Sequence, residues 1–166
     1  LDNKVLTDSI EAGREEYVTA ASNIWDYAET CFQEYKSSEE LCKLLEKHGF
    51  QVERGVAGLD TAFVATAGAG EPVIGFMGEY DALPSLSQKA GVAEHDPIVE
   101  GAPGHGCCHH ILGTAAVAAA IAAKDYKEQH QLPGTIRFYG CPAEEGGEGK
   151  IYMAKAGLFD DAACAI

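Results

Sequence analysis

Two cysteines and two histidines stand side by side in the stretch GHGCCHH, residues 104–110, with His105 just upstream of them. Cysteine thiolates and histidine imidazoles are good ligands for zinc and related divalent metals. Where the backbone is extended or turns, the step from Cys107 to His109 can aim both side chains at one ion. From this stretch alone two other interpretations stay open, namely helix-start residues with no metal, or a strained disulfide between Cys107 and Cys108.

A pair of glutamates, Glu144 and Glu145, forms a second group in the glycine-rich stretch CPAEEGGEG. Successive side chains of an extended segment point apart, so one carboxylate can bind a metal while its neighbour faces a substrate. Such an arrangement suits hydrolysis, because a metal lowers the pKa of a bound water and a free carboxylate takes its proton. The alternative is a solvated acidic loop.

A third group is GEYDALP, in which Asp81 follows Glu79 at the end of an apolar run. An unpaired acid at the end of a buried strand is costly. We therefore expect a histidine or a metal as the partner of Asp81, with a helix or turn cap as the alternative.

Periodicity predicts the elements that must position these groups. Apolar residues at three- and four-residue steps predict a helix over residues 8–30, and SSEELCKLLEKHGF predicts a second helix that begins after Ser37. Short β-branched and aromatic runs predict three strands, FQVERGV, TAFVATA and the apolar PVIGFMGEY, which we expect near the centre of the sheet. Residues 81–106, with three prolines, predict a long loop. The remainder predicts a helix in HILGTAAVAAAIAAKDY, a strand in GTIRFYGC, a loop in AEEGGEG and a short helix in KIYMAKAGLF.

The alternation of strands and helices predicts an α/β fold with a mostly parallel central sheet. In such sheets, sites form at the carboxyl ends of the strands. GEYDALP and CPAEEGG each leave the end of a predicted strand, and GHGCCHH opens the helix between those strands. We therefore expect the three groups to converge on one edge of the sheet.

Composition narrows the classes of partner. The chain of 166 residues has the length of one domain, and its formal net charge of −14 opposes binding to nucleic acid or to anionic lipid. There is no apolar run of roughly 20 residues and no basic leader, so we expect no membrane span and a cytoplasmic location. Six cysteines are too sparse for a disulfide scaffold, which favours ligand roles for the clustered ones.

Taken in order, GEYDALPSLSQ, EGAPGHGCCHHILGTA and GTIRFYGCPAEEGGEGK resemble the metal-dependent amidohydrolases of the aminoacylase and carboxypeptidase superfamily of zinc peptidases. Within that superfamily the resemblance is to the p-aminobenzoyl-glutamate hydrolase-like branch. It implies a zinc-exopeptidase-like three-layer sandwich that is interrupted by a lid and dimerisation domain. It also implies one or two divalent ions, zinc or manganese, and cleavage of an amide in an N-acyl-amino acid or a dipeptide.

The resemblance also assigns roles to residues. Cys107 and His109 match the Cys-Gly-His metal ligands, and Glu145 matches the carboxylate ligand. Glu144 matches the general base that activates a metal-bound water. Asp81 falls on the aspartate of the Asp-Ala-Leu-Pro motif, where it is expected to orient a ligand.

Two positions depart from the family pattern. Cys108 replaces a glycine, and His110 replaces an asparagine. If that glycine needs a positive φ, a cysteine there would distort the site. The alternative is that Cys108 or His110 adds a ligand, and we favour distortion.

The family pattern continues beyond the point where this sequence stops. The resemblance therefore predicts that residues 1–166 are the N-terminal part of a catalytic domain, incomplete at the C-terminal end and without the lid. Three candidate ligands are enough for one ion. An exposed sheet edge predicts self-association, as in a homo-oligomer. Besides a hydrolase, the pattern is compatible with a truncated, inactive relative that holds a metal or a partner without turnover.

Overall fold

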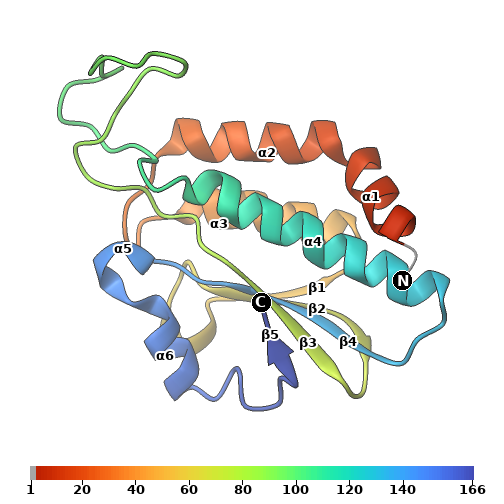
Figure 1. Ribbon diagram of the computed structural model, residues 1–166. Helices are drawn as coiled ribbons and strands as arrows, with labels where there is room; N and C mark the ends of the chain where they lie inside the picture. The colour runs from red at the N-terminus through yellow and green to blue at the C-terminus, as the bar shows by residue number, and fades with distance from the viewer. Residues whose placement is uncertain (1–2) are drawn as a thin grey trace.

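A sheet of five strands lies between two helical layers in the computed structural model, which describes residues 3–166 (Figure 1). In chain order the elements are α1 (Asn3–Ala12), α2 (Arg14–Tyr27), α3 (Tyr35–Lys47), β1 (Gln51–Arg54), the 3-10 turn η1 (Val56–Gly58), β2 (Phe63–Ala69), β3 (Val73–Gly78), α4 (His109–Gln129), β4 (Gly134–Gly140), α5 (Glu144–Gly147), α6 (Gly149–Lys155) and β5 (Cys164–Ala165). None of the helices in this described part is both long and apolar enough to cross a membrane.

The strand order is β1-β2-β4-β3-β5. The strand β2 pairs antiparallel with β1 and with β4, whereas β3 pairs parallel with β4 and with β5. Among residues 3–166, β2 is thus the one strand that runs against the others, and the predicted mostly parallel sheet is confirmed. The central strand of the sheet is β4 rather than β3, which is its neighbour. The sequence pattern hid this because Arg137 interrupts the apolar run of β4, where its guanidinium binds Asp161.

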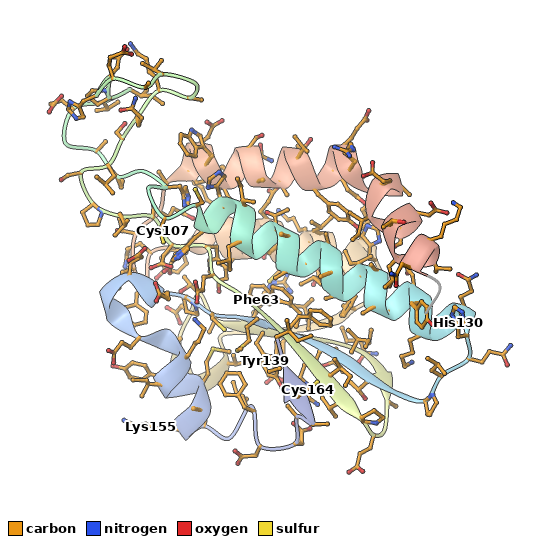
Figure 2. All side chains as sticks on the ribbon, viewed as in Figure 1. Phe63, Cys107, His130, Tyr139, Lys155 and Cys164 are labelled. Atoms are coloured by element: carbon orange, nitrogen blue, oxygen red, sulfur yellow. The ribbon has the colours of Figure 1, made fainter. Side chains whose placement is uncertain are left out.

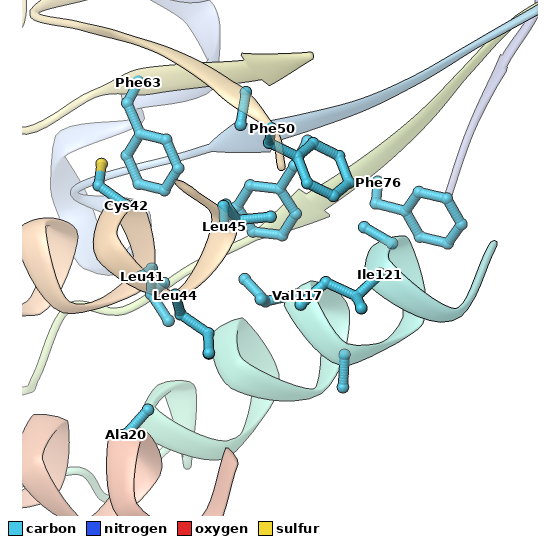
Figure 3. Packing of buried hydrophobic residues seen from close by; sticks show 14 of the residues in the cluster. Ala20, Leu41, Cys42, Leu44, Leu45, Phe50, Phe63, Phe76, Val117 and Ile121 are labelled. Atoms are coloured by element: carbon cyan, nitrogen blue, oxygen red, sulfur yellow. The ribbon is translucent and has the colours of Figure 1, made fainter. Parts of the chain in front are cut away.

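The core has two parts because successive side chains of a strand point to opposite faces of the sheet. On β4, Phe138 packs into the cluster formed with α2, α3 and α4, whereas Tyr139 packs on the other face with Met153 of α6. Figure 3 shows the larger cluster, in which side chains from α3 and α4 meet the aromatic rings of the sheet. These two cores give the predicted three layers.

The N-terminal helical region differs from the prediction. Residues 8–30 do not form one helix, because the chain breaks at Gly13 between α1 and α2, and α2 ends at Tyr27. A Cβ atom on residue 13 would lie 2.5 Å from the ring of Tyr17, so a larger residue there would have to displace that ring. The helix α3 begins at Tyr35, three residues before the predicted start at Ser38, and its N-cap position is Glu34 rather than Ser37.

Residues 81–106 form the predicted loop, with no helix or named strand in that stretch. The loop closes on itself near its base, where the backbone of Leu83 exchanges hydrogen bonds of 3.0 Å with that of Gly104. This closure returns the chain to the end of β3 and delivers GHGCCHH to the start of α4. The predicted loop AEEGGEG contains the short helical turn α5.

Candidate metal centre

Three chain segments meet at the carboxyl ends of β3 and β4. These strands are parallel neighbours, and Gly78 pairs with Gly140, so they end at the same level of the sheet. The segments that follow them carry Asp81 and the pair Glu144 and Glu145. Figure 2 shows Cys107 just before the start of α4, above the end of the sheet from which α5 departs. The convergence expected from the sequence is therefore present.

The imidazole of His109 is the centre of the group. This side chain is buried, and its Nδ1 lies 3.0 Å from Oδ1 of Asp81. An ionised carboxylate only accepts hydrogen bonds, so Nδ1 carries the proton and Nε2 is left as the free nitrogen. The hydrogen bond to Asp81, together with neighbouring carboxylates, raises the pKa of His109 against the opposing effect of burial.

Carboxylates surround the free nitrogen. Nε2 of His109 lies 3.3 Å from Oε2 of Glu79, 3.8 Å from Oε2 of Glu144 and 3.8 Å from Oε1 of Glu145. A nitrogen lone pair that faces three negative groups is repelled unless a proton or a metal ion lies between them. The grouping therefore suits a proton or a metal ion at Nε2 of His109.

Asp81 holds two parts of the group at once. Its Oδ1 accepts the Nδ1 proton of His109, and its Oδ2 accepts the backbone N–H of Glu145 at 2.9 Å. Burial alone would raise the pKa of Asp81, but these hydrogen bonds outweigh burial and lower it. Asp81 is 2% exposed, so it acts on its neighbours rather than on a bound molecule.

Two overlapping sets of side chains could hold a metal. In Cys107, His109 and Glu145, one ligand atom from each lies within 4.8 Å of the others, and the same is true of Glu79, His109 and Glu144. A thiolate, an imidazole and a carboxylate form a zinc-like set, whereas two carboxylates with an imidazole suit a harder ion such as manganese. Both sets use the free Nε2 of His109, and one nitrogen binds one ion.

The thiol of Cys107 is exposed and lies beside Glu145. Its hydrogen bond to the carboxylate of Glu145 raises the pKa of Cys107. Cys107 and Glu145 are thus close enough that both, once deprotonated, could bind the same cation.

Sequence reasoning gave Lys150 and Glu79 no role of their own. Lys150, near the start of α6, forms an ion pair with Oε1 of Glu79, whose other oxygen faces His109. The lysine thus offsets one of the negative charges around the imidazole. The only signal in the sequence was the position of Glu79, two residues before Asp81.

Glu34 was also missed, although its side chain is entirely buried at 0% exposure. It accepts hydrogen bonds from the N–H groups of Phe32 and Ala143, at 3.0 and 2.8 Å, and from the hydroxyl of Thr61 at 2.9 Å. Burial raises the pKa of Glu34 in spite of these hydrogen bonds. A glutamate among polar residues before a helix is usually exposed, so the sequence carries no signal for this contact.

The two departures from the family pattern lie outside both sets. Cys108 has φ 63° and ψ 25°, the left-handed conformation that glycine adopts at least cost, and its side chain is exposed. His110 is buried against Trp25, with ring centroids 4.9 Å apart. Within residues 3–166, neither one belongs to a group of side chains that could hold a metal. Cys108 thus has the positive φ at which a side chain was expected to distort the site, but Cys107, His109 and Glu145 still lie close enough together to hold a metal.

The chain is similar to several curated hydrolases. It is 51% identical over 163 residues to a subunit of p-aminobenzoyl-glutamate hydrolase from Escherichia coli (strain K12), covering 98% of this chain and 34% of that protein. It is 32% identical over 139 residues to IAA-amino acid hydrolase ILR1-like 6 of Arabidopsis thaliana, covering 83% of this chain and 28% of the relative. The chain thus spans about a third of the length of the curated relatives that it matches.

Solved structures share the fold. The Bacillus subtilis YXEP protein, described as a dinuclear metal binding peptidase from the M20 family, matches 99% of this chain and 43% of its own, with a TM-score of 0.72 and 22% identity. The aminobenzoyl-glutamate utilization protein from Klebsiella pneumoniae matches 95% of this chain and 44% of its own, with a TM-score of 0.66 and 18% identity. The family model that describes peptidase family M20/M25/M40 matches residues 75–166, more than half of the sequence, and the chain therefore belongs to that family.

Proposed function

We propose that the chain is part of the catalytic domain of a metal-dependent amidohydrolase. Its substrates would be N-acyl-amino acids or aminobenzoyl-glutamate-like dipeptides. One observation carries the proposal: the Nε2 atom of His109, freed by Asp81, faces the carboxylates of Glu144 and Glu145. The substrate class is supported by the name of the Escherichia coli relative, which belongs to a p-aminobenzoyl-glutamate hydrolase.

In this proposal Cys107, His109 and Glu145 hold a zinc or manganese ion. Thiolate, imidazole and carboxylate ligands fit zinc, and the nearby carboxylates of Glu79 and Glu144 extend the choice to manganese. When bound, the ion would supply an acidified water and an electrophile for the amide oxygen. Three ligands suffice for one ion, and His109 is the histidine in both ligand sets found among the described residues.

The chemistry assigned to this chain's own residues is proton transfer and orientation. Glu144 has a side chain that is 43% exposed and lies 3.8 Å from Nε2 of His109, so it is free to meet both water and substrate. It would take a proton from the attacking water and return it to the leaving amine. Asp81 would hold the Nδ1–H of His109 and so keep Nε2 as the ligand atom.

The test is hydrolysis by the purified protein with zinc or manganese, on a panel of N-acyl-amino acids and p-aminobenzoyl-glutamate. We expect cleavage of at least one substrate, and loss of that cleavage when a chelator removes the metal. Full metal occupancy without cleavage would favour the second function, a metal-binding module without turnover.

A further inference from the structure

Two buried carboxylates hold the backbone on either side of Glu144. On one side, Glu34 accepts the N–H of Ala143 at 2.8 Å. On the other side, Asp81 accepts the N–H of Glu145 at 2.9 Å. Glu144 is the one residue between these two anchored positions.

The backbone between the anchors is not one that the chain adopts by itself. Ala143 has φ 58° and ψ 42°, in the left-handed region that a Cβ atom disfavours. Glu145 has φ −73° and ψ 64°, which is outside helical geometry, and the helical turn that contains it has four residues. A conformation of this kind persists only where surrounding groups impose it.

Glu34 is itself held rigidly. Its Oε1 also accepts the N–H of Phe32, and its Oε2 accepts the hydroxyl of Thr61. The carbonyl of Thr61 accepts the hydroxyl of Tyr80 at 2.6 Å, and Tyr80 immediately precedes Asp81. The two anchors are therefore joined by two buried hydrogen bonds through Thr61 and by the covalent backbone from Tyr80 to Asp81.

We propose that Glu34 is a positioning residue of the metal centre, which holds the N–H of Ala143 and thereby sets the direction in which Glu144 and Glu145 leave β4. This inference rests on the proposed function, because it concerns how the base and the carboxylate ligand of that site are aimed. Glu34 lies 109 residues before Ala143 in the chain, and within residues 3–166 it forms no hydrogen bond with the side chain of either glutamate.

Two substitutions at Glu34 distinguish the loss of its hydrogen-bond acceptor from a change in side-chain size. In Glu34→Gln the remaining carbonyl oxygen still accepts from Phe32 and Ala143, and the amide can donate to the Thr61 hydroxyl, which is able to accept. In Glu34→Met the length is similar but no acceptor is left, so the N–H of Ala143 loses its partner.

Glu29 offers a matched control. Its carboxylate accepts the N–H groups of Lys36 and Ser37, at 3.0 and 2.8 Å, at the start of α3. Glu29→Met therefore removes the same kind of contact, but at a place that does not touch residues 143–145. The variant reports the general loss of stability that Glu34→Met also causes.

The measurement is zinc affinity, by competition with a chromophoric chelator at a temperature where every variant is folded. Removing a group that orients a metal ligand typically lowers metal affinity about 10- to 100-fold. Glu34→Met should therefore bind zinc at least about tenfold more weakly than the parent protein. On the same scale, Glu34→Gln and Glu29→Met should stay within about threefold of the parent protein. An unchanged affinity in Glu34→Met, or an equal loss in Glu29→Met, would overturn the inference.

A second measurement decides the matter if Glu34→Met does not fold. In the parent protein without metal, the amide of Ala143 should exchange its hydrogen slowly, because the buried carboxylate of Glu34 holds it. Rapid exchange at Ala143 in the folded protein would overturn the inference. A parent protein that binds neither zinc nor manganese would instead overturn the proposed function, and this inference with it.

Discussion

Nδ1 of His109 lies 3.0 Å from Oδ1 of Asp81, and both side chains are almost completely shielded from solvent. The contact fixes the ring orientation and leaves Nε2 toward the glutamates. Carboxylate partners of this kind raise the basicity of a metal-binding imidazole. The pair explains why a histidine at the first position of α4 is aimed at the ends of β3 and β4.

Replacing Asp81 with asparagine should weaken metal binding. The amide oxygen can still accept from His109, but the amide nitrogen then faces the N–H of Glu145, and two donors oppose each other. Zinc affinity should fall about 10- to 100-fold, as measured by calorimetry. Asp60→Asn, at an exposed position before β2, is the control. Equal affinities in the two variants would show that Asp81 does not orient the site.

Replacing Glu144 with glutamine should remove the base but keep the metal. If the proposed hydrolysis occurs, kcat should fall by about 10²- to 10⁴-fold, because an amide cannot take the proton of water. The zinc content should stay at the parent level, since Glu144 is outside the set of Cys107, His109 and Glu145. Glu148→Gln, in the same loop and exposed, should keep kcat. A fully active Glu144→Gln would exclude Glu144 as the base.

Replacing Cys108 with glycine should stabilise the protein. Cys108 has a positive φ of 63°, which costs a residue with a Cβ atom about 1–2 kcal/mol, partly offset by the greater freedom of glycine in the unfolded chain. The free energy of unfolding in denaturant should rise by about 0.5–1 kcal/mol. As a control, Ala115→Gly introduces glycine inside α4 and should lower the free energy of unfolding by about 0.5–1 kcal/mol. Two changes of the same sign would contradict this explanation.

The buried carboxyl of Glu34 should make stability depend on pH. Burial raises its pKa above the ordinary value of 4.5, so the folded protein keeps this proton to a higher pH than the unfolded chain does. The stability that the protonated Glu34 carboxyl contributes is therefore fully present below the ordinary pKa, and it is lost as the pH rises through the raised pKa. Glu34→Gln cannot ionise, so its stability relative to the parent should increase as the pH rises from the ordinary value of 4.5 through the raised pKa.

Unfolding by urea at several pH values across that interval checks this expectation. Glu29→Gln provides the comparison, since Glu29 is less buried than Glu34. A stability difference between Glu34→Gln and the parent that does not change with pH would show that the Glu34 carboxyl has no raised pKa.

The grouping of the candidate site residues could be predicted because it follows from the sheet. Two strands that run parallel and end in register bring Asp81 and Glu145 together, and the helix between those strands adds His109 at the same edge. Each of these residues is next to the end of an element that periodicity identifies. Local sequence was therefore enough to place them.

The supporting contacts could not be predicted because they depend on packing between distant segments. Glu34 meets Ala143, which is 109 positions away, and Lys150 meets Glu79, which is 71 positions away. Nothing in the local pattern separates these charged residues from exposed ones. The break at Gly13 was missed for a similar reason, because the apolar period continues through it and the close contact of residue 13 with the ring of Tyr17 is visible only in the structure.

The most direct test of the metal centre is X-ray absorption at the zinc edge of the zinc-loaded protein. With Cys107, His109 and Glu145 as ligands, the spectrum should contain one sulfur neighbour at about 2.3 Å and nitrogen and oxygen neighbours at about 2.0–2.2 Å. In Cys107→Ser the sulfur neighbour should disappear. A parent spectrum without sulfur, or a sulfur neighbour that persists in Cys107→Ser, would contradict the assignment of Cys107 to the metal centre.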